Sequence, residues 1–345
     1  MKLSLWIYNF FLVFLISWLP INKVYALSMF LVSCEAQIQT NPIIISNAVK
    51  PANTSLESTN AILEYSCTNS SVFEGYVSLC FAVDGGDYKN NALSPRYMKN
   101  ESNSLLAFNM TLPDGSIWGS RTHSFSEYNT GPIYIAGRPL FSPYAKISGL
   151  IPIKVSLVAD PTNFLASPGQ YINNFGSGNH TSLTFDADTN QSLSNCLTKN
   201  QGSGRFEFEV RATVIPSCEI TSISDMNLGA YSAGNQNISG TNNIDVRCTN
   251  SVPYYIGLVP SNKNNLGSGI MNGTSSTDKI PYQLRSTNGL EGKIWGNTAT
   301  STNVGNGVSG IGTGSTNTHP VYVTVPQTDV RPDNYSDTVD IRVNY

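Results

Sequence analysis

Charged residues and histidine are scarce in this chain of 345 residues. Asp, Glu, Lys and Arg together make up 12%, there are only 3 His, and the net charge is −3 with no cluster of basic residues. A nucleic-acid-binding surface needs many cations to displace the counterions of phosphates, so no nucleic-acid partner is expected. His123, His180 and His319 have no partner at metal-ligand spacing. Each is interpreted as a solvated loop residue, and no metal or other cofactor is expected.

Runs of Glu, Lys and Leu, which favour helices, are also missing, whereas Gly, Ser, Thr and Asn are abundant. Short segments with alternating apolar residues recur between turn residues, and these segments are 62–65, 76–83, 106–110, 153–158, 254–259, 282–284 and 321–325. Such spacing without a 3.6-residue period predicts an all-β fold of immunoglobulin-like β-sandwiches.

The N-terminus has the features of a secretory signal. Lys2 precedes an apolar stretch over residues 5–19, and a small-residue cleavage pattern ends at Ala26. An uncleaved membrane anchor is the alternative, but the apolar run is short and interrupted. Residues 1–26 are therefore predicted to be a signal peptide.

The remaining chain repeats one series of landmarks. In the first copy these are Cys34-Glu35, Cys67-Thr68-Asn69-Ser70, Ile117-Trp118-Gly119 and the Pro-x-x-Tyr from Pro168 to Tyr171. In the second copy they are Cys218-Glu219, Cys248-Thr249-Asn250-Ser251, Ile294-Trp295-Gly296 and the Pro-x-x-Tyr from Pro332 to Tyr335. Each tryptophan is interpreted as a core residue. The repeat predicts two tandem sandwich domains, over residues 27–214 and 215–345.

Export places all six cysteines in an oxidising compartment, where an even number indicates disulfides. Fifteen pairings are possible for six cysteines. Alignment of the two copies proposes Cys34 with Cys67 and Cys218 with Cys248. This choice leaves Cys80 with Cys196.

The two copies differ in the strands that follow the Pro-x-x-Tyr. After Tyr171 there is room for two strands, around 183–185 and 206–214, whereas after Tyr335 there is room for one. The second domain is therefore expected to lack its last strand. An edge strand left unpaired is an aggregation hazard unless another chain covers it. We expect that edge to expose Val339, Ile341, Val343 and Tyr345.

The second copy resembles the spore coat U domain family, the pilin fold of archaic chaperone-usher pili. The residues that carry the resemblance are the pair Cys218 and Cys248, Ile294-Trp295-Gly296, Tyr335-Ser336-Asp337-Thr338 and Val343-Asn344-Tyr345. Two tandem copies are similar to the tip adhesin subunit of Csu-type pili. The first copy has diverged, because it adds Cys80 and Cys196 and a longer stretch before its Pro-x-x-Tyr.

The resemblance implies assembly by donor-strand complementation, in which a strand from another chain completes an open sandwich. The implied partners are a periplasmic chaperone, an outer-membrane usher and the N-terminal donor strand of the next pilin subunit. Only residues 27–33 precede Cys34 in the mature chain, so it is expected to receive a strand but not to donate one. It is then expected at the pilus tip on the bacterial cell surface.

The segment 205–214 alternates strictly between apolar and polar residues. Phe206, Phe208, Val210, Ala212 and Val214 share one face of an extended strand. This donor-like segment is predicted to close the first domain within the same chain.

The first copy also has extra aromatic residues between 120 and 148, including Tyr128 and Tyr134. Since a loop has no core to fill, they predict an apolar binding surface, and an extra hairpin packed on its own domain is the alternative. Phe73 with Val72, and Tyr97 with Met98, are placed near the same end. The predicted surface-binding residues are Phe73, Tyr97, Leu140, Phe141, Pro143 and Tyr144.

No motif predicts an enzyme. Residues 305–310 match G-x-G-x-x-G, but no helix is expected to follow them, so they are interpreted as a flexible loop. Asp84 and Asp114 lie in Gly-rich turns, where carboxylates cap the local backbone. The expected function is a tip adhesin that attaches cells to abiotic or host surfaces in biofilm formation. The alternatives are a lectin-like tip subunit and a non-adhesive shaft or secreted coat protein.

Overall fold

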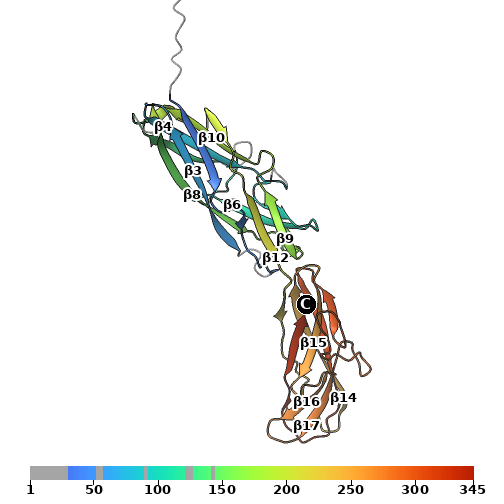
Figure 1. Ribbon diagram of the computed structural model, residues 1–345. Helices are drawn as coiled ribbons and strands as arrows, with labels where there is room; N and C mark the ends of the chain where they lie inside the picture. The colour runs from blue at the N-terminus through green and yellow to red at the C-terminus, as the bar shows by residue number, and fades with distance from the viewer. Residues whose placement is uncertain (1–29, 52–56, 89–91, 121–126, 141–143) are drawn as a thin grey trace, which may run out of the picture.

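The computed structural model describes residues 30–51, 57–88, 92–120, 127–140 and 144–345. They form two β-sandwich domains that lie end to end (Figure 1), which confirms the all-β prediction. The predicted signal peptide, residues 1–26, lies outside the described residues. Helical segments in the described part are short, as in α2 (Pro161–Phe164) and η2 (Gln191–Leu193), and none is long and apolar enough to cross a bilayer.

The first domain packs an eight-stranded sheet on a four-stranded sheet. The larger sheet has the order β1 (Val32–Ile38), β3 (Ser58–Asn69), β8 (Ala145–Leu157), β6 (Leu105–Thr111), β5 (Arg96–Lys99), β9 (Gly169–Asn174), β12 (Glu209–Val214) and β2 (Ile43–Ile44). The smaller sheet has the order β11 (Gly202–Gly204), β10 (Thr181–Asp188), β4 (Gly75–Val83) and β7 (Tyr128–Ile135).

The second domain has the same plan with fewer strands. Its larger sheet has the order β13 (Cys218–Ser222), β14 (Gln236–Cys248), β19 (Thr316–Gln327), β17 (Lys279–Arg285), β16 (Ser268–Gly273) and β20 (Tyr335–Ser336). Its smaller sheet has the order β18 (Val308–Ile311), β15 (Pro253–Pro260) and β21 (Val339–Asn344).

These strand orders match one to one over most of the two domains. The series from β1 to β9 corresponds to the series from β13 to β20, and β10, β4 and β7 correspond to β21, β15 and β18, with antiparallel pairing throughout. The first domain additionally has β11, β12 and β2. The internal repeat of the sequence is therefore a structural repeat.

The repeated landmarks occupy equivalent places in the two cores. Trp118 and Trp295 are fully buried, and each indole donates to a backbone carbonyl of the opposite sheet, Phe81 O at 2.9 Å and Ile256 O at 2.8 Å. The three predicted disulfides, Cys34–Cys67, Cys80–Cys196 and Cys218–Cys248, are all present. The tryptophans thus serve the packing role expected of them.

Strand β12 closes the larger sheet of the first domain. It runs antiparallel to β9 and parallel to β2, so it has a neighbour on both sides. Its apolar face is buried in the first core, with at most 4% exposure for Phe206, Phe208, Val210, Ala212 and Val214. Regular pairing begins only at Glu209, but the alternation extends back to Phe206. The prediction that this segment closes the first domain within one chain is confirmed.

Candidate functional site

The end of the first domain that points away from the second domain carries exposed apolar side chains. Two loops supply them, the β3–β4 connection and the β7–β8 connection. Their exposed fractions are 55% for Val72, 53% for Phe73, 80% for Leu140 and 52% for Tyr144. We refer to these four residues as the distal surface. Leu31 lies beside them, since its carbonyl accepts from Ser70 N at 3.0 Å, and its side chain is also exposed.

A buried amide holds the two loops together. Asn69 is fully buried, and its Nδ2 donates to Phe73 O at 2.8 Å and to Ala136 O at 2.9 Å. Its Oδ1 accepts from the backbone and hydroxyl of Ser71. A Cβ on Gly137 would lie 2.2 Å from Val72 O, so only glycine permits this approach. These contacts hold residues 69–73 against residues 136–137, while the distal side chains face solvent.

The predicted set of binding residues is only partly brought together. Phe73, Leu140 and Tyr144 lie at the distal end, while Phe141 and Pro143 lie outside the described residues. Tyr97 is half-buried in β5, where burial and then nearby Asp160 raise the pKa of its phenol. Asp160 is the N-cap of α2, at the end of the domain that contacts the second domain. The expected grouping of Tyr97 with Phe73 is therefore wrong, and its neighbour Met98 is fully buried.

The aromatic stretch between 120 and 148 is not a single loop. Strand β7 pairs with β4, so Tyr128 packs partly against the first core, with its ring centroid 6.4 Å from that of Phe81. Tyr134 points outward from β7, and its hydroxyl donates to Glu74 Oε2 at 2.7 Å, which raises the pKa of the phenol. Residues 128–135 are thus a regular strand of the smaller sheet and not an extra hairpin, and the loop interpretation applies to residues 136–140 and 144.

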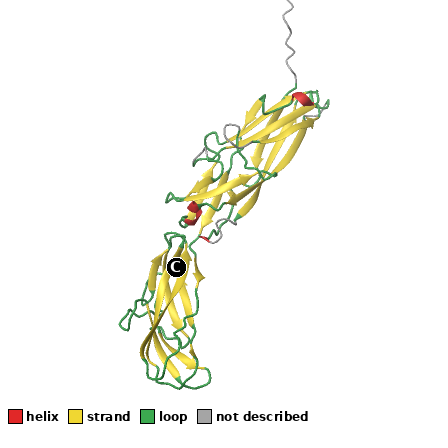
Figure 2. Cartoon of the chain, turned by 180° about the vertical axis from the view of Figure 1, so that it is seen from behind, coloured by secondary structure: helices red, strands yellow, loops and turns green. Residues whose placement is uncertain are grey.

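Leu193 and Leu197 are two further exposed apolar residues of the first domain. Both are about half exposed, next to η2, which Figure 2 shows at the same end of the domain. Cys196 N donates to Ser78 Oγ at 2.7 Å, and the Cys80–Cys196 disulfide ties this segment to β4. The extra disulfide of the first copy therefore supports the distal end.

A second candidate site is the edge of the second domain. In the described part of that domain no strand takes the place that β12 has beside β9, and β20 pairs only with β16. The apolar residues of β21, Val339, Ile341 and Val343, are half-buried against the second core, and Tyr345 is 49% exposed. The counterpart of β21 in the first domain is β10, and its core-facing residues Leu183 and Phe185 are buried. The predicted groove-edge residues thus lie together on one strand.

The segment after β13 continues this partly open side. Ile223 is exposed, and Met226 and Leu228 are only partly buried against the second core. In the first domain the corresponding segment is β2, which pairs with β12. We refer to this partly covered side, between β20, β21 and residues 223–228, as the groove of the second domain.

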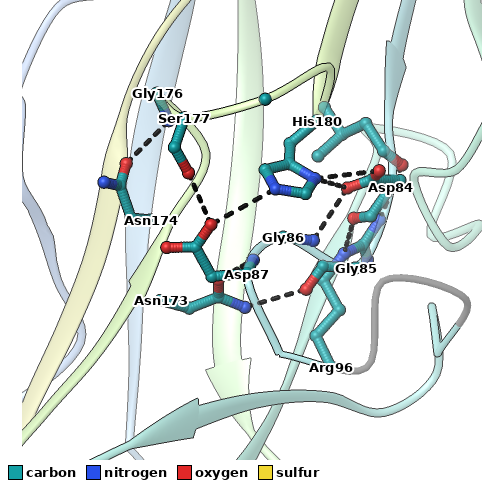
Figure 3. Close-up of polar contacts among 12 residues, drawn as sticks. Asp84, Gly85, Gly86, Asp87, Arg96, Asn173, Asn174, Gly176, Ser177 and His180 are labelled. Atoms are coloured by element: carbon teal, nitrogen blue, oxygen red, sulfur yellow. Dashed lines mark hydrogen bonds and ion pairs between the residues drawn. The ribbon is translucent and has the colours of Figure 1, made fainter.

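A polar cluster in the first domain was not predicted from the sequence. His180 Nδ1 lies 2.9 Å from Asp84 Oδ1, and its Nε2 lies 3.3 Å from Asp87 Oδ1 (Figure 3). Asp87 also accepts from Ser177 Oγ at 2.5 Å, and Asn173 Nδ2 donates to Gly85 O at 2.9 Å. The interpretation of His180 as a solvated loop residue is therefore wrong, because its side chain is only 14% exposed.

Arg96 supports the same turn from inside the domain. It is fully buried, and its guanidinium donates to the carbonyls of Asp84, Leu93, Val83 and Trp118. Burial lowers its pKa to about 9, against the opposing effect of Asp84. Within the described residues no group of three or more His, Cys, Asp or Glu is arranged to hold a metal ion. The cluster fastens the turn after β4 to the β9–β10 connection.

Asp84 also has a local role, as do Asp114 and His319. Asp84 and Asp114 accept from Gly86 N at 2.7 Å and Ser116 N at 3.0 Å, which confirms the predicted caps. His319 lies in β19, and its Nε2 is 2.7 Å from the hydroxyl of Tyr254. Burial lowers the pKa of this imidazole. It is a packed strand residue, so its interpretation as a loop residue is also wrong, and His123 lies outside the described residues.

Comparison with known families bears on the second copy. The sequence model of the Spore Coat Protein U domain family matches residues 205–342. Residues 205–342 therefore carry the sequence pattern of this domain. The match begins ahead of Cys218, so the Spore Coat Protein U domain includes the segment that forms β12 in the first domain.

Solved structures show the same fold. CsuE, the tip adhesion subunit in the CsuC-CsuE chaperone-tip adhesion subunit pre-assembly complex of archaic chaperone-usher Csu pili of Acinetobacter baumannii, is 15% identical with a TM-score of 0.50. The alignment covers 91% of this chain and 100% of that one. At this identity the likeness establishes a shared two-domain β fold.

More distant structures also align over most of the chain. The CupB6 tip adhesin from Pseudomonas aeruginosa is 10% identical with a TM-score of 0.34, and the alignment covers 90% of this chain and 93% of that one. CfaE, the adhesive subunit of CFA/I fimbria of enterotoxigenic Escherichia coli, is 10% identical with a TM-score of 0.33 over 88% and 93%. Neither likeness is close enough to support an argument. No curated protein matches the sequence.

Proposed function

We propose that this protein is a pilus tip adhesin, in which the first domain attaches to surfaces and the second domain anchors it to the next pilin. The supporting observation is the distal surface. Val72, Phe73, Leu140 and Tyr144 are exposed on loops held by the buried Asn69, at the end opposite the second domain. Clustered exposed apolar residues mark interaction sites in soluble domains.

The proposed ligand is an apolar surface, abiotic or on a host cell. Burial of a large apolar side chain contributes roughly 1.5–3 kcal/mol, so three or four such contacts suffice for weak attachment by one tip. Many pili on one cell then act together, because each attached tip keeps the others close to the surface. The hydrogen bonds of Asn69 to Phe73 O and Ala136 O limit the conformational entropy that this part of the surface loses on contact.

The groove of the second domain supports the anchoring role. We infer that the N-terminal strand of the next pilin fills it, and that a periplasmic chaperone fills it before assembly at the outer-membrane usher. The first domain provides the pattern, because residues 206–214, which include β12, fill the equivalent place with five buried apolar residues. By this pattern the donor runs antiparallel to the chain at Tyr335 and parallel to residues 223–228. The protein then reaches the cell surface through the periplasm and ends the pilus.

Attachment assays on assembled pili test the adhesive role. The variant carries Val72→Ser, Phe73→Ser, Leu140→Ser and Tyr144→Ser. The control carries Leu266→Ser and Ile311→Ser, which are 60% and 64% exposed on the second domain. We expect the first variant to lose attachment to polystyrene while its pili assemble normally, and the control to attach like the natural protein.

The alternatives make different predictions in the same assay. Attachment to immobilised glycans that survives the distal substitutions would favour the lectin-like subunit. Normal attachment of all variants to every surface would place adhesion elsewhere in the pilus, as the shaft or coat alternative requires.

A further inference from the structure

The contact between the two domains has a definite structure. Asn250 Nδ2 donates to Leu165 O at 2.7 Å. A Cβ on Gly314 would lie 1.6 Å from Phe164 O, so the turn at Gly314 lies directly on the end of α2. Pro161, Phe164 and Leu165 face Arg247, Gly314 and Thr316 across one cavity. We call residues 161–165 the base of the first domain, and residues 249–250 with 312–316 the head of the second.

The covalent connection between the domains is held at the same place. Ile215 N donates to Val49 O at 3.1 Å in the first domain, and Ile215 O accepts from Thr249 Oγ1 at 3.0 Å in the second. Thr249 N also donates to Ser217 O at 2.8 Å. Strand β12, the connection and the head of the second domain therefore form one continuous contact with the first domain.

This contact joins a Spore Coat Protein U domain to the domain that its N-terminal strand completes, since the family match begins at residue 205. We propose that it is an internal copy of the contact between this protein and the next subunit of the pilus. This inference rests on the proposed function. It adds that the next subunit binds through its folded domain, the body of the subunit, as well as through its donor strand. It also locates the surface of this protein that contacts that body.

The structural repeat identifies that surface on the second domain. Tyr171 donates from its hydroxyl to the carbonyl of Ser167 at 2.8 Å, four residues earlier, and Tyr335 donates likewise to Arg331 O at 2.7 Å. Leu165 lies six residues before Tyr171. The residue six before Tyr335 is Asp329, and the equivalent of Phe164 is Thr328. The base of the second domain is thus residues 328–329, with Asp329 exposed.

The partner that fits this base is another Spore Coat Protein U domain with a short glycine turn in its head. The head of the second domain has Gly312 and Gly314 at this turn, and Gly314 lies too close to Phe164 O for any side chain. At the same end the first domain has Leu140 and Tyr144 instead, both exposed. Side chains as large as Leu140 and Tyr144 leave no room for the close backbone approach that the glycine turn allows. The first domain is therefore not expected to bind the base of another subunit.

The test uses the full chain extended by a second copy of its own Spore Coat Protein U domain. After Tyr345 the extended protein carries a Gly/Ser linker as long as segment 186–204, then residues 205–345 again, then a second linker and residues 205–217 to complete the added domain. Asp329→Cys in the second domain and Asn250→Cys in the added copy are joined by a short bis-maleimide. The natural cysteines are all paired, so only the new thiols react.

Two controls calibrate the cross-link. Leu165→Cys with Asn250→Cys in the original chain reports the contact between the two domains. The negative control pairs Ile311→Cys in the second domain with Asn250→Cys in the added copy. These thiols should not cross-link, because Ile311 lies next to the head of the second domain and the added copy is expected at its base. Resistance of the second domain to proteolysis reports, separately, that the added strand has entered the groove.

We expect protection from proteolysis together with a 329–250 cross-link close in yield to the original contact. Protection without this cross-link would overturn the proposed body contact and leave strand complementation in place. Absence of protection would overturn both the body contact and the complementation on which it rests.

Discussion

The ring of Phe206 stacks on that of Trp118, with centroids 5.7 Å apart and planes 3° apart. Phe208 stacks in turn on Phe175 at 4.6 Å. The strand that precedes the second domain thus contributes its aromatic side chains to the centre of the first core. Removal of residues 206–214 would therefore open the first core.

This packing predicts that two neighbouring substitutions change the free energy of unfolding by very different amounts. Phe208→Asp places a carboxylate in the core and removes a stacked ring, which should cost at least the roughly 3–5 kcal/mol of a buried Phe→Ala change. Glu207→Lys lies on the exposed face and should change the free energy of unfolding by less than about 0.5 kcal/mol. Denaturant unfolding of the first domain measures both, and equal tolerance would mean that the segment is not a closing strand.

The closing strand was predictable because alternation with period two is a local property of the sequence. The disulfides were predictable because two copies of one pattern constrain each other. The His180 cluster was not, since Asp84 and His180 are 96 residues apart and meet only through the pairing of β4 with β10. Tyr97 was misplaced for the same reason, because nothing local shows at which end of the domain β5 lies.

Loop geometry should matter for attachment as much as the exposed side chains do. Asn69→Ala leaves the carbonyls of Phe73 and Ala136 without their donor, which should cost about 1–3 kcal/mol. We expect attachment to polystyrene to fall although all four distal residues remain. Asn190→Ala, which removes only the exposed cap of η2, is the control. Full attachment by the Asn69→Ala protein would show that attachment does not depend on the hydrogen bonds of Asn69.

The domain junction should be sensitive to a single methyl group. Gly314→Ala introduces a Cβ at Phe164 O, whereas Gly234→Ala has a similar positive φ and meets no atom within 4 Å. Both changes strain the backbone, but only the first should change the angle between the domains and increase their relative motion. Small-angle scattering of the two variants measures this difference, and identical profiles would mean that the Gly314 turn does not set the junction.

The stability of the second domain at acidic pH should depend on one ion pair. Hydrogen bonds from Arg331, with Nε 2.9 Å from Asp278 Oδ2, lower the pKa of Asp278 from 3.8 to about 2. Because the folded-state pKa is the lower one, this contribution to stability is present above about pH 4 and is lost as the pH falls toward 2. NMR titration of the carboxyl should give a midpoint near 2, and Arg331→Gln should raise it toward 3.8. An unchanged midpoint in that variant would assign the shift to another group.

The open groove predicts that the two domains of the full chain differ in stability. The second domain should unfold first on heating, because its apolar edge at Val339, Ile341 and Val343 is covered on one side only. A peptide of residues 205–217 should raise that transition and leave the first unchanged, since binding to the folded state stabilises it by about 2.7 kcal/mol when the free peptide is 100 times Kd. The same peptide with Asp in place of Val210 is the control, because a charge on the buried face opposes insertion. Calorimetry resolves the transitions separately in a two-domain protein. A second domain that melts as high as the first and ignores both peptides would show that its sandwich is already complete.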